Sequence, residues 1–251
     1  MKSPLDFERC LTFINSQLQP EGRSPTPARP GTVPQAVTIS RQAGCGALVI
    51  GQKVAEYLQN RSVKDAVPWT VFDRNLVEKV LEDHDLPRRL AAFMQEDRIS
   101  QISDILEEVC GLHPPSWFLA KKTADTILHL AELGNVILIG RGSNIITSRL
   151  DYVFHVRLIG SLKKRLQHVQ DFNQLDPHAA MEFIRSRDGG RRRYVKKYFH
   201  KDIDDPLLYH LIINTDVVSC DHAARIIGNA VLSRVTTPLP HNLSAITSLT
   251  K

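Results

Sequence analysis

Short apolar runs alternate with amphipathic segments along most of the chain. Five runs rich in β-branched residues look continuously hydrophobic, which is typical of strands buried on both faces of a parallel sheet. These runs are Val37–Ser40, Trp69–Phe72, Val136–Ile139, Val153–Arg157 and Leu211–Asn214. The segments between them repeat apolar residues every three or four positions, which indicates helices. The pattern predicts a doubly wound α/β fold with a five-stranded parallel sheet and helices on both faces.

The expected helices have recognisable ends and faces. Val49–Gln59 is one helix, and Trp117–Leu133 is another that stops at Gly134. Ser161 and Asp221 are expected to cap the last two helices of this kind. The residues expected to face the core are Ile50, Val54, Leu58, Leu162, Leu166, Val169, Ala224, Ile227 and Val231.

The chain also divides into regions by composition. Residues 1–18 predict an amphipathic helix, which docks either on the core or on another chain as a self-association element. Residues 19–35 are rich in proline and predict a linker. The main domain is expected over 36–235, with a helical insertion at about 86–133 and a helical lid at about 176–201. The Ser-, Thr- and Pro-rich tail, 236–251, is expected to be disordered.

The charge is concentrated in one place. The chain has 251 residues and a net charge of +5, yet Arg185–Lys201 alone carries eight Lys or Arg against one Asp. A compact basic cluster suits a few phosphate groups better than a nucleic-acid duplex, so no nucleic-acid partner is expected. There is no apolar stretch long enough to span a membrane and no secretion-type start. Four scattered cysteines argue against a disulfide framework or zinc site, so a cytoplasmic location is expected.

A glycine-containing loop follows the first expected strand and precedes a helix. Its residues, all candidates for binding nucleotide phosphates, are Ser40, Arg41, Gln42, Ala43, Gly44, Cys45, Gly46, Ala47 and Leu48. Glycines in this context let backbone N–H groups approach an anion at the helix N-terminus. In the Walker A pattern, GxxxxGK followed by Ser or Thr, the first Gly falls on Arg41, the Lys on Ala47 and the hydroxyl on Leu48. The loop is therefore either a degenerate phosphate loop, with Arg41 standing in for the lysine, or a plain strand-to-helix turn.

Five segments, taken in order, resemble the cytidylate-kinase-like family. They are Val37–Gly46, Phe72–Arg74, Ile137–Gly142, Asp188–Tyr198 and Tyr209–Thr215, and the resemblance covers about residues 37–233. It implies a P-loop nucleoside-monophosphate-kinase fold in which CMP, dCMP or a related small acceptor takes a phosphoryl group from ATP with Mg²⁺. The chain departs from the family at Ala47 and at Leu48, where the family has arginine. The alternative is therefore a catalytically weak or inactive nucleotide-binding regulatory module of the same fold.

The resemblance and the residue chemistry together nominate catalytic residues. Arg141 lies between two glycines after the third strand, and Arg187, Asp188 and Arg191 match the family's lid motif. Arginine forks suit phosphoryl transfer because they bind phosphate oxygens in pairs. The competing interpretation is a surface loop cation at Arg141 and a solvated basic face on the lid. No histidine or cysteine spacing predicts a metal site.

The remaining candidates lie at the second strand and in the lid. Asp73 and Arg74 are expected to bind the acceptor, although Asp73 could equally cap the next helix. Gly189 and Gly190 interrupt the lid helix and favour a closing movement. Two lid tyrosines, Tyr194 and Tyr198, are expected to pack the lid onto the core. The acidic cluster Asp202, Asp204 and Asp205 precedes a proline and is interpreted as a turn.

Overall fold

A parallel five-stranded sheet forms the centre of the protein. The computed structural model describes residues 35–62, 67–73 and 116–236. The strands are β1 (Ala36–Arg41), β2 (Thr70–Phe72), β3 (Val136–Ile139), β4 (Val153–Ile159) and β5 (Leu211–Asn214), in the order β2-β3-β1-β4-β5. All paired neighbours run parallel, which confirms the predicted sheet. The predicted N-terminal helix, linker, insertion over 86–115, Arg74 and most of the tail lie outside the described residues.

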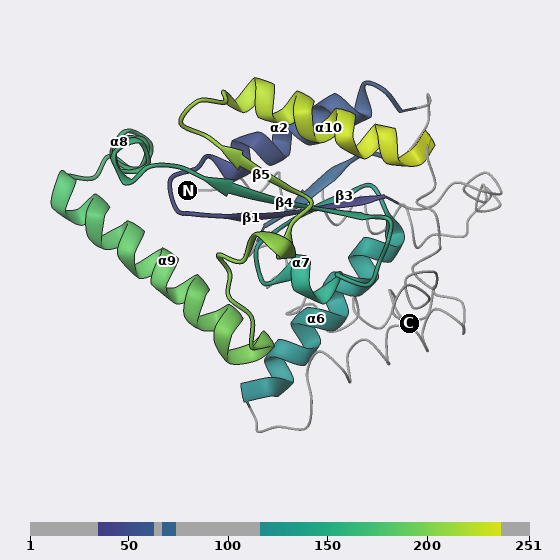
Figure 1. Cartoon of the computed structure of the whole chain (residues 1–251), viewed down its shortest axis with the longest axis horizontal. Helices are drawn as coiled ribbons and strands as arrows, with labels where there is room; N and C mark the ends of the chain where they lie inside the picture. Colours follow the sequence, from purple (N-terminus) through teal and green to yellow (C-terminus); the bar gives the residue numbers. More distant parts are fainter. Residues whose placement is uncertain (1–34, 63–66, 74–115, 237–251) are drawn as a thin grey trace, which may run out of the picture.

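Helices cover both faces of the sheet (Figure 1). Helices α2 (Ala47–Gln59) and α10 (Cys220–Thr236) lie on one face, and α6 (Ser116–Leu133) and α7 (Ser143–Ile146) lie on the other. Alternate strand residues point into these two layers, because side chains alternate along a strand. Val37 and Ile39 pack toward α2 and α10, whereas Ala36 belongs to the opposite core. The α6 part of the predicted insertion is therefore a core helix.

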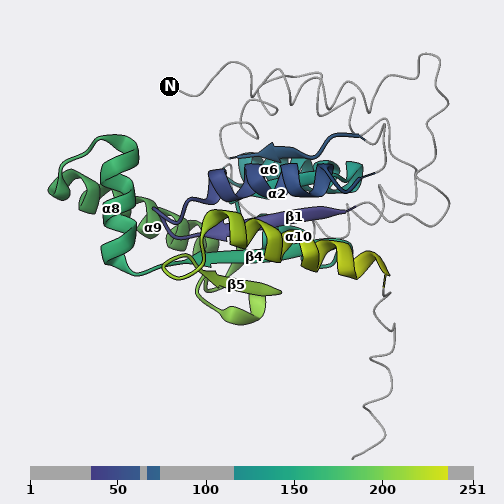
Figure 2. The ribbon, with the colours of Figure 1, turned by 90° about the horizontal axis from the view of Figure 1, so that it is seen from above.

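A helical pair extends from the carboxyl ends of the strands. Helix α8 (Leu162–Asn173) follows β4 and leads into α9 (Pro177–Phe199), and a short 3₁₀ helix, η1 (Pro206–Leu208), precedes β5. Figure 2 shows α8 and α9 projecting beyond one end of the sheet. Ser161 caps α8 as predicted, since its side chain accepts a hydrogen bond from the Lys164 N–H.

Two sequence predictions about helix ends and faces are wrong. Helix α10 begins at Cys220, so Asp221 lies in its first turn, and the Ser219 hydroxyl accepts the His222 N–H at 3.3 Å instead. The Asp221 carboxylate pairs with Lys53 at 2.6 Å. Leu162 is 45% exposed instead of facing the core, because α8 stands off the end of the sheet.

Helix α9 is held by two separate apolar clusters. Its C-terminal half packs Val195 and Phe199 into the core with α6 and α7, and Tyr194 and Tyr198 pack against the same cluster, as predicted. Its N-terminal half packs against α8 and Ala43 in a small separate cluster. Gly189–Gly190 lies between these two anchoring regions. The C-terminal half of α9 therefore belongs to the main core, whereas the N-terminal half packs with α8.

Replacing Gly190 with alanine is expected to stabilise the protein. No atom outside the helix lies within 4 Å of a Cβ added at this position, so packing does not require glycine. Alanine in a helix interior is favoured over glycine by about 1 kcal/mol. Urea unfolding should therefore show a gain of about 1 kcal/mol for Gly190→Ala. A loss would contradict the ordinary helical geometry assigned to this junction.

One face of the sheet at β1 and β4 is more polar than the sequence pattern suggests. Val153–Arg157 was expected to be continuously hydrophobic, yet His155 and Arg157 share one face of β4 and pair with Thr38 and Ser40 of β1. The Thr38 hydroxyl lies 2.8 Å from His155 Nδ1. Burial, with the nearby His210 and Arg234, lowers the pKa of His155 to about 3.

This buried histidine should make stability fall in acid. His155 stays neutral in the folded chain down to about pH 3 but is protonated below its ordinary value, 6.5, when unfolded. Its contribution is therefore complete above pH 6.5 and is lost progressively between 6.5 and about 3. Between pH 6.5 and 5 this amounts to about 2 kcal/mol. His155→Gln should remove that part of the pH dependence in urea unfolding, and the exposed control His222→Gln should retain it.

Candidate functional site

The loop between β1 and α2 turns through two glycines that have positive φ. Gly46, at the N-cap of α2, has φ +66°, and Gly44 has φ +86°, a region that glycine occupies without strain. A Cβ on Gly44 would lie 2.6 Å from the Arg165 carbonyl oxygen, so α8 also packs closely against this loop. The strand–glycine loop–helix arrangement predicted from the sequence is present.

The positions of the missing Walker residues are occupied by apolar side chains. Ala47 is buried, and Leu48 packs against the cluster beneath α2 and α10. Neither side chain has an oxygen for Mg²⁺, and the described residues contain no group of three His, Cys, Asp or Glu that could hold a metal. The loop therefore does not fit Mg²⁺ in the Walker manner. Cys45 is also buried, which raises the pKa of its thiol and suits packing more than reactivity.

The Asp188 carboxylate of α9 accepts a hydrogen bond from one backbone N–H of the loop. The Ala43 N–H donates to Asp188 Oδ1 at 2.7 Å. Arg165 Nη1 donates to Asp188 Oδ2 at 2.7 Å, and Arg191 Nη1 donates to Oδ1 at 3.0 Å. Arg165 also donates to the Ala43 carbonyl at 3.2 Å. One backbone donor and two guanidinium groups thus converge on a single anionic group.

Arg41 extends away from the loop's backbone toward the end of β3. A Cβ on Gly140 would collide with its guanidinium group, which places Arg41 against the loop between β3 and α7. Burial, with the like charges of Arg191 and Arg141, lowers the pKa of Arg41 to about 9, although Asp73 and Asp188 act in the opposite direction. Arg41 thus lies between the glycine loop and the turn that follows β3.

Three arginines from different elements therefore lie close together. Arg41 ends β1, Arg191 comes from α9, and Arg141 follows β3 with φ +58°. The Arg141 guanidinium lies 5.9 Å from the centre of the Tyr194 ring, toward α9. Burial lowers the pKa of Arg191 despite its contact with Asp188. Because buried cations are costly unless an anion compensates them, this region is suited to an anionic ligand.

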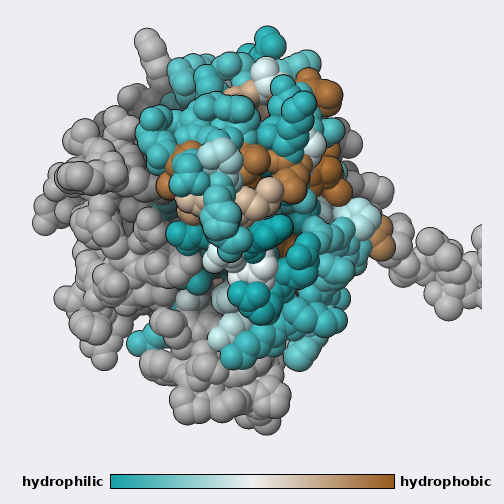
Figure 3. All heavy atoms as spheres, turned by 90° about the vertical axis from the view of Figure 1, so that its left-hand side faces the viewer, coloured by the Kyte–Doolittle hydropathy of each residue, from teal (hydrophilic) through white to brown (hydrophobic). Residues whose placement is uncertain are grey.

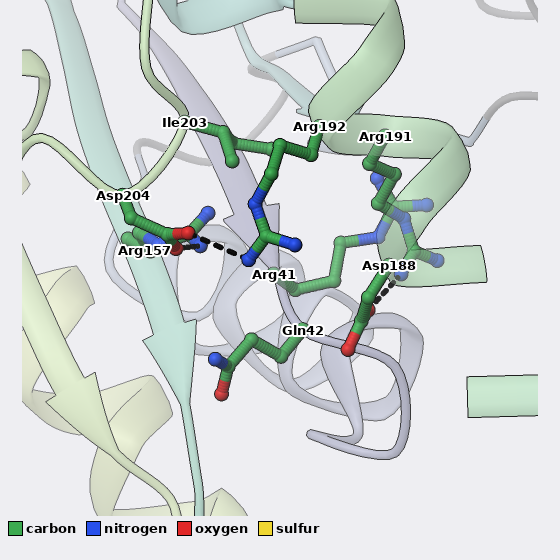
Figure 4. Close-up of a pocket in the computed structure, with 8 residues that line it drawn as sticks. All are labelled: Arg41, Gln42, Arg157, Asp188, Arg191, Arg192, Ile203 and Asp204. Atoms are coloured by element: carbon green, nitrogen blue, oxygen red, sulfur yellow. Dashed lines mark hydrogen bonds and ion pairs between the residues drawn. The ribbon is translucent and has the colours of Figure 1, made fainter. Parts of the chain in front are cut away.

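A pocket opens beside these arginines at the carboxyl ends of β1 and β4 (Figure 4). Its lining residues are Arg41, Gln42, Arg157, Asp188, Arg191, Arg192, Ile203 and Asp204. Four arginines thus face two aspartates. Hydrophilic residues cover most of the described surface at this end of the molecule, with some apolar residues among them (Figure 3). Ligands of open α/β sheets bind at this edge.

Of the other predicted site residues, Asp73 lies near the arginines and Arg187 lies away from the pocket. Asp73 follows β2, is only 8% exposed and acts electrostatically on Arg41. Arg187 is exposed on α9, with its guanidinium 5.3 Å from the Phe183 ring, and does not line the pocket. Arg74 lies outside the described residues, as does the helix that Asp73 was alternatively expected to cap.

Sequence reasoning missed three arginines. Arg165 is nearly buried and contacts both loop and lid, but the helical pattern assigned the inward face of α8 to leucines. Arg157 appeared only as the last residue of an apolar run, although a charge within a buried strand is itself a signal of a polar partner. Arg192 is not among the residues nominated from the sequence, yet it lines the pocket.

The fold is that of a P-loop-type α/β protein, and its arginine-lined pocket lies at the carboxyl ends of the strands. A model of the cytidylate kinase-like family matches residues 36–217, and the chain belongs to this family. A search of curated proteins finds no match. None of the helices within the described ranges is long and apolar enough to cross a membrane.

Solved structures of similar fold include an uncharacterized protein from Eubacterium ventriosum. It is 19% identical, with a TM-score of 0.52 over 80% of this chain and 99% of its own. Shikimate kinase from Bacteroides thetaiotaomicron is 12% identical, with a TM-score of 0.43 over 79% of this chain and 98% of its own. TT1252 from Thermus thermophilus is 15% identical, with a TM-score of 0.37 over 82% of this chain and 100% of its own.

Proposed function

We propose that the protein is a nucleoside-monophosphate-kinase-like phosphotransferase that moves the γ-phosphoryl group of ATP to CMP, dCMP or a related small acceptor. The observation that carries the proposal is the convergence of Arg41, Arg141 and Arg191 beside the glycine loop. The family membership supports a kinase-like activity, and it is also the ground for proposing nucleotides as ligands. A cytoplasmic location, where such nucleotides occur, is part of the proposal.

The arginines supply what phosphoryl transfer needs most, which is positive charge around the moving group. In this proposal Arg41 and Arg191 bind phosphoryl oxygens from two sides, and Arg141 approaches from the end of β3. Asp188 positions Arg191 through its 3.0 Å bond and releases the Ala43 N–H when a phosphate oxygen takes its place. Asp73, buried beside Arg41, is proposed to orient the acceptor.

A coupled assay of ADP release across a panel of nucleoside monophosphates tests this proposal. We expect turnover with at least one of them, CMP or dCMP first, and Arg193→Gln should behave like the wild type because Arg193 is exposed and does not line the pocket. Absence of turnover with every acceptor, with and without added Mg²⁺, would contradict it.

A second candidate is a binding module of the same fold that does not turn nucleotides over. It is favoured by the apolar Ala47 and Leu48 and by the Asp188 carboxylate on the loop's N–H. Calorimetry would then show nucleotide binding at micromolar concentrations without ADP release. A chain that binds no nucleotide would contradict this candidate as well.

A further inference from the structure

The pocket contains a second group of charges, which is centred on Asp204. Arg157, on β4, has a side chain only 4% exposed. Its Nη1 donates to the Ser40 hydroxyl at 2.9 Å, and its Nη2 is bonded to Asp204 Oδ1. Arg192, from α9, donates to Asp204 Oδ2 at 2.9 Å. Two guanidinium groups thus share one carboxylate, one on each oxygen.

This arrangement has more positive charge than its carboxylate compensates. Burying a guanidinium group in a central strand is costly without full pairing, and here one carboxylate serves two arginines. Arg157 also lines a pocket that already contains Arg41 and Arg191. In Figure 4, Arg192 reaches from α9 toward Asp204 and Arg157 on one side of the pocket, and Arg41 lies on the other. An added anion would lower the electrostatic cost of the whole pocket.

The carboxylate in this group is the component best able to leave. Asp204 is 42% exposed and lies in the short irregular segment between α9 and η1. Arg157, in contrast, is fixed by the sheet and by Ser40, and the Tyr209 hydroxyl lies 3.4 Å from its Nη1. Guanidinium forks bind carboxylate and phosphate oxygens in the same manner. A phosphoryl group can therefore replace the Asp204 carboxylate without rebuilding the site.

We infer that Arg157 and Arg192 form a second anion subsite that takes a phosphoryl group in exchange for Asp204. This phosphoryl group is distinct from the one that is transferred, because Arg157 and Arg192 lie on the Asp204 side of the pocket and Arg41 lies on the other (Figure 4). The ligand class is a small phosphorylated molecule that presents an additional phosphoryl group at the end of β4. If the proposed function holds, this molecule is the phosphoryl acceptor. The subsite itself does not depend on the proposed function.

Calorimetric titration with inorganic phosphate, without nucleotide, tests the subsite on the full chain. Arg192→Gln should weaken phosphate binding about tenfold, since a charge-assisted hydrogen bond to the anion is lost. Asp204→Asn should strengthen it several-fold, because the competing carboxylate is removed while the side-chain volume is kept. Arg193→Gln, one residue along α9 and outside the pocket, should bind phosphate like the wild type.

The outcomes separate this inference from the proposed function. Phosphate binding that is equal in Arg192→Gln and Arg193→Gln, or that is not strengthened by Asp204→Asn, overturns the subsite even if the enzyme turns over. Absence of phosphate binding in the wild type also overturns it. Binding with the expected order of affinities supports the subsite even where no nucleoside monophosphate is turned over. Thermal unfolding of each variant shows whether that variant is folded at the temperature of the titration.

Discussion

Arg41→Met is expected to lower kcat/KM by about a hundredfold or more while leaving the protein at least as stable as the wild type. The Arg41 guanidinium is buried, and its pKa is lowered to about 9 because burial and Arg191 oppose its charge. Methionine fills similar space without requiring compensation, so the free energy of unfolding should not fall. The phosphoryl group would lose one of its cations, and activity should therefore fall.

Steady-state kinetics and urea unfolding on the same preparation measure both effects. Arg193→Met is the matched control, since it removes an exposed arginine outside the pocket and should change neither quantity appreciably. Wild-type kinetics in Arg41→Met would contradict the assignment of Arg41 to the phosphoryl site. A large loss of stability would instead show that Arg41 is a structural ion-pair partner.

Asp188→Asn is expected to reduce the free energy of unfolding by about 3 kcal/mol. The Asp188 carboxylate pairs with Arg165 at 2.7 Å and with Arg191 at 3.0 Å, and these arginine side chains are only 10% and 25% exposed. Asparagine keeps the volume and an acceptor for the Ala43 N–H, but it leaves the guanidinium groups without a compensating charge. The loss arises mainly from those uncompensated cations.

Glu182→Gln provides the comparison on the same helix. Glu182 pairs with Arg185 at 3.4 Å, but both side chains are more than half exposed, so the change should cost less than about 1 kcal/mol. Urea unfolding at neutral pH measures both variants. Equal, small losses for Asp188→Asn and Glu182→Gln would contradict the view that Asp188 links the lid to the loop.

The sheet and its glycine loop could be predicted because they depend on local pattern. Runs such as Val136–Ile139 have no polar face, so both faces of the strand must be buried in the sheet. The positive φ values of Gly44 and Gly46 likewise follow from a turn that only glycine enters easily. Helix α2 then follows from its apolar stripe.

The charge pairs could not be predicted because they depend on distant parts of the chain. Ser40 and Arg157 are 117 positions apart and meet only because β1 pairs with β4. Periodicity also could not show that Leu162 is exposed and Arg165 is buried, because it does not reveal that α8 projects beyond the sheet. Arg187 and Arg191 share a helix face, yet α9 contributes only Asp188, Arg191 and Arg192 to the pocket.

ATP binding to three forms of the protein tests the central claim that the arginines at this edge of the sheet bind phosphate. Isothermal titration should give micromolar binding to the wild type and to Arg193→Gln, and binding about tenfold or more weaker to Arg191→Gln, which loses the lid's guanidinium group in the pocket. Equal ATP affinity in Arg191→Gln and Arg193→Gln, or no binding to the wild type, would contradict the account.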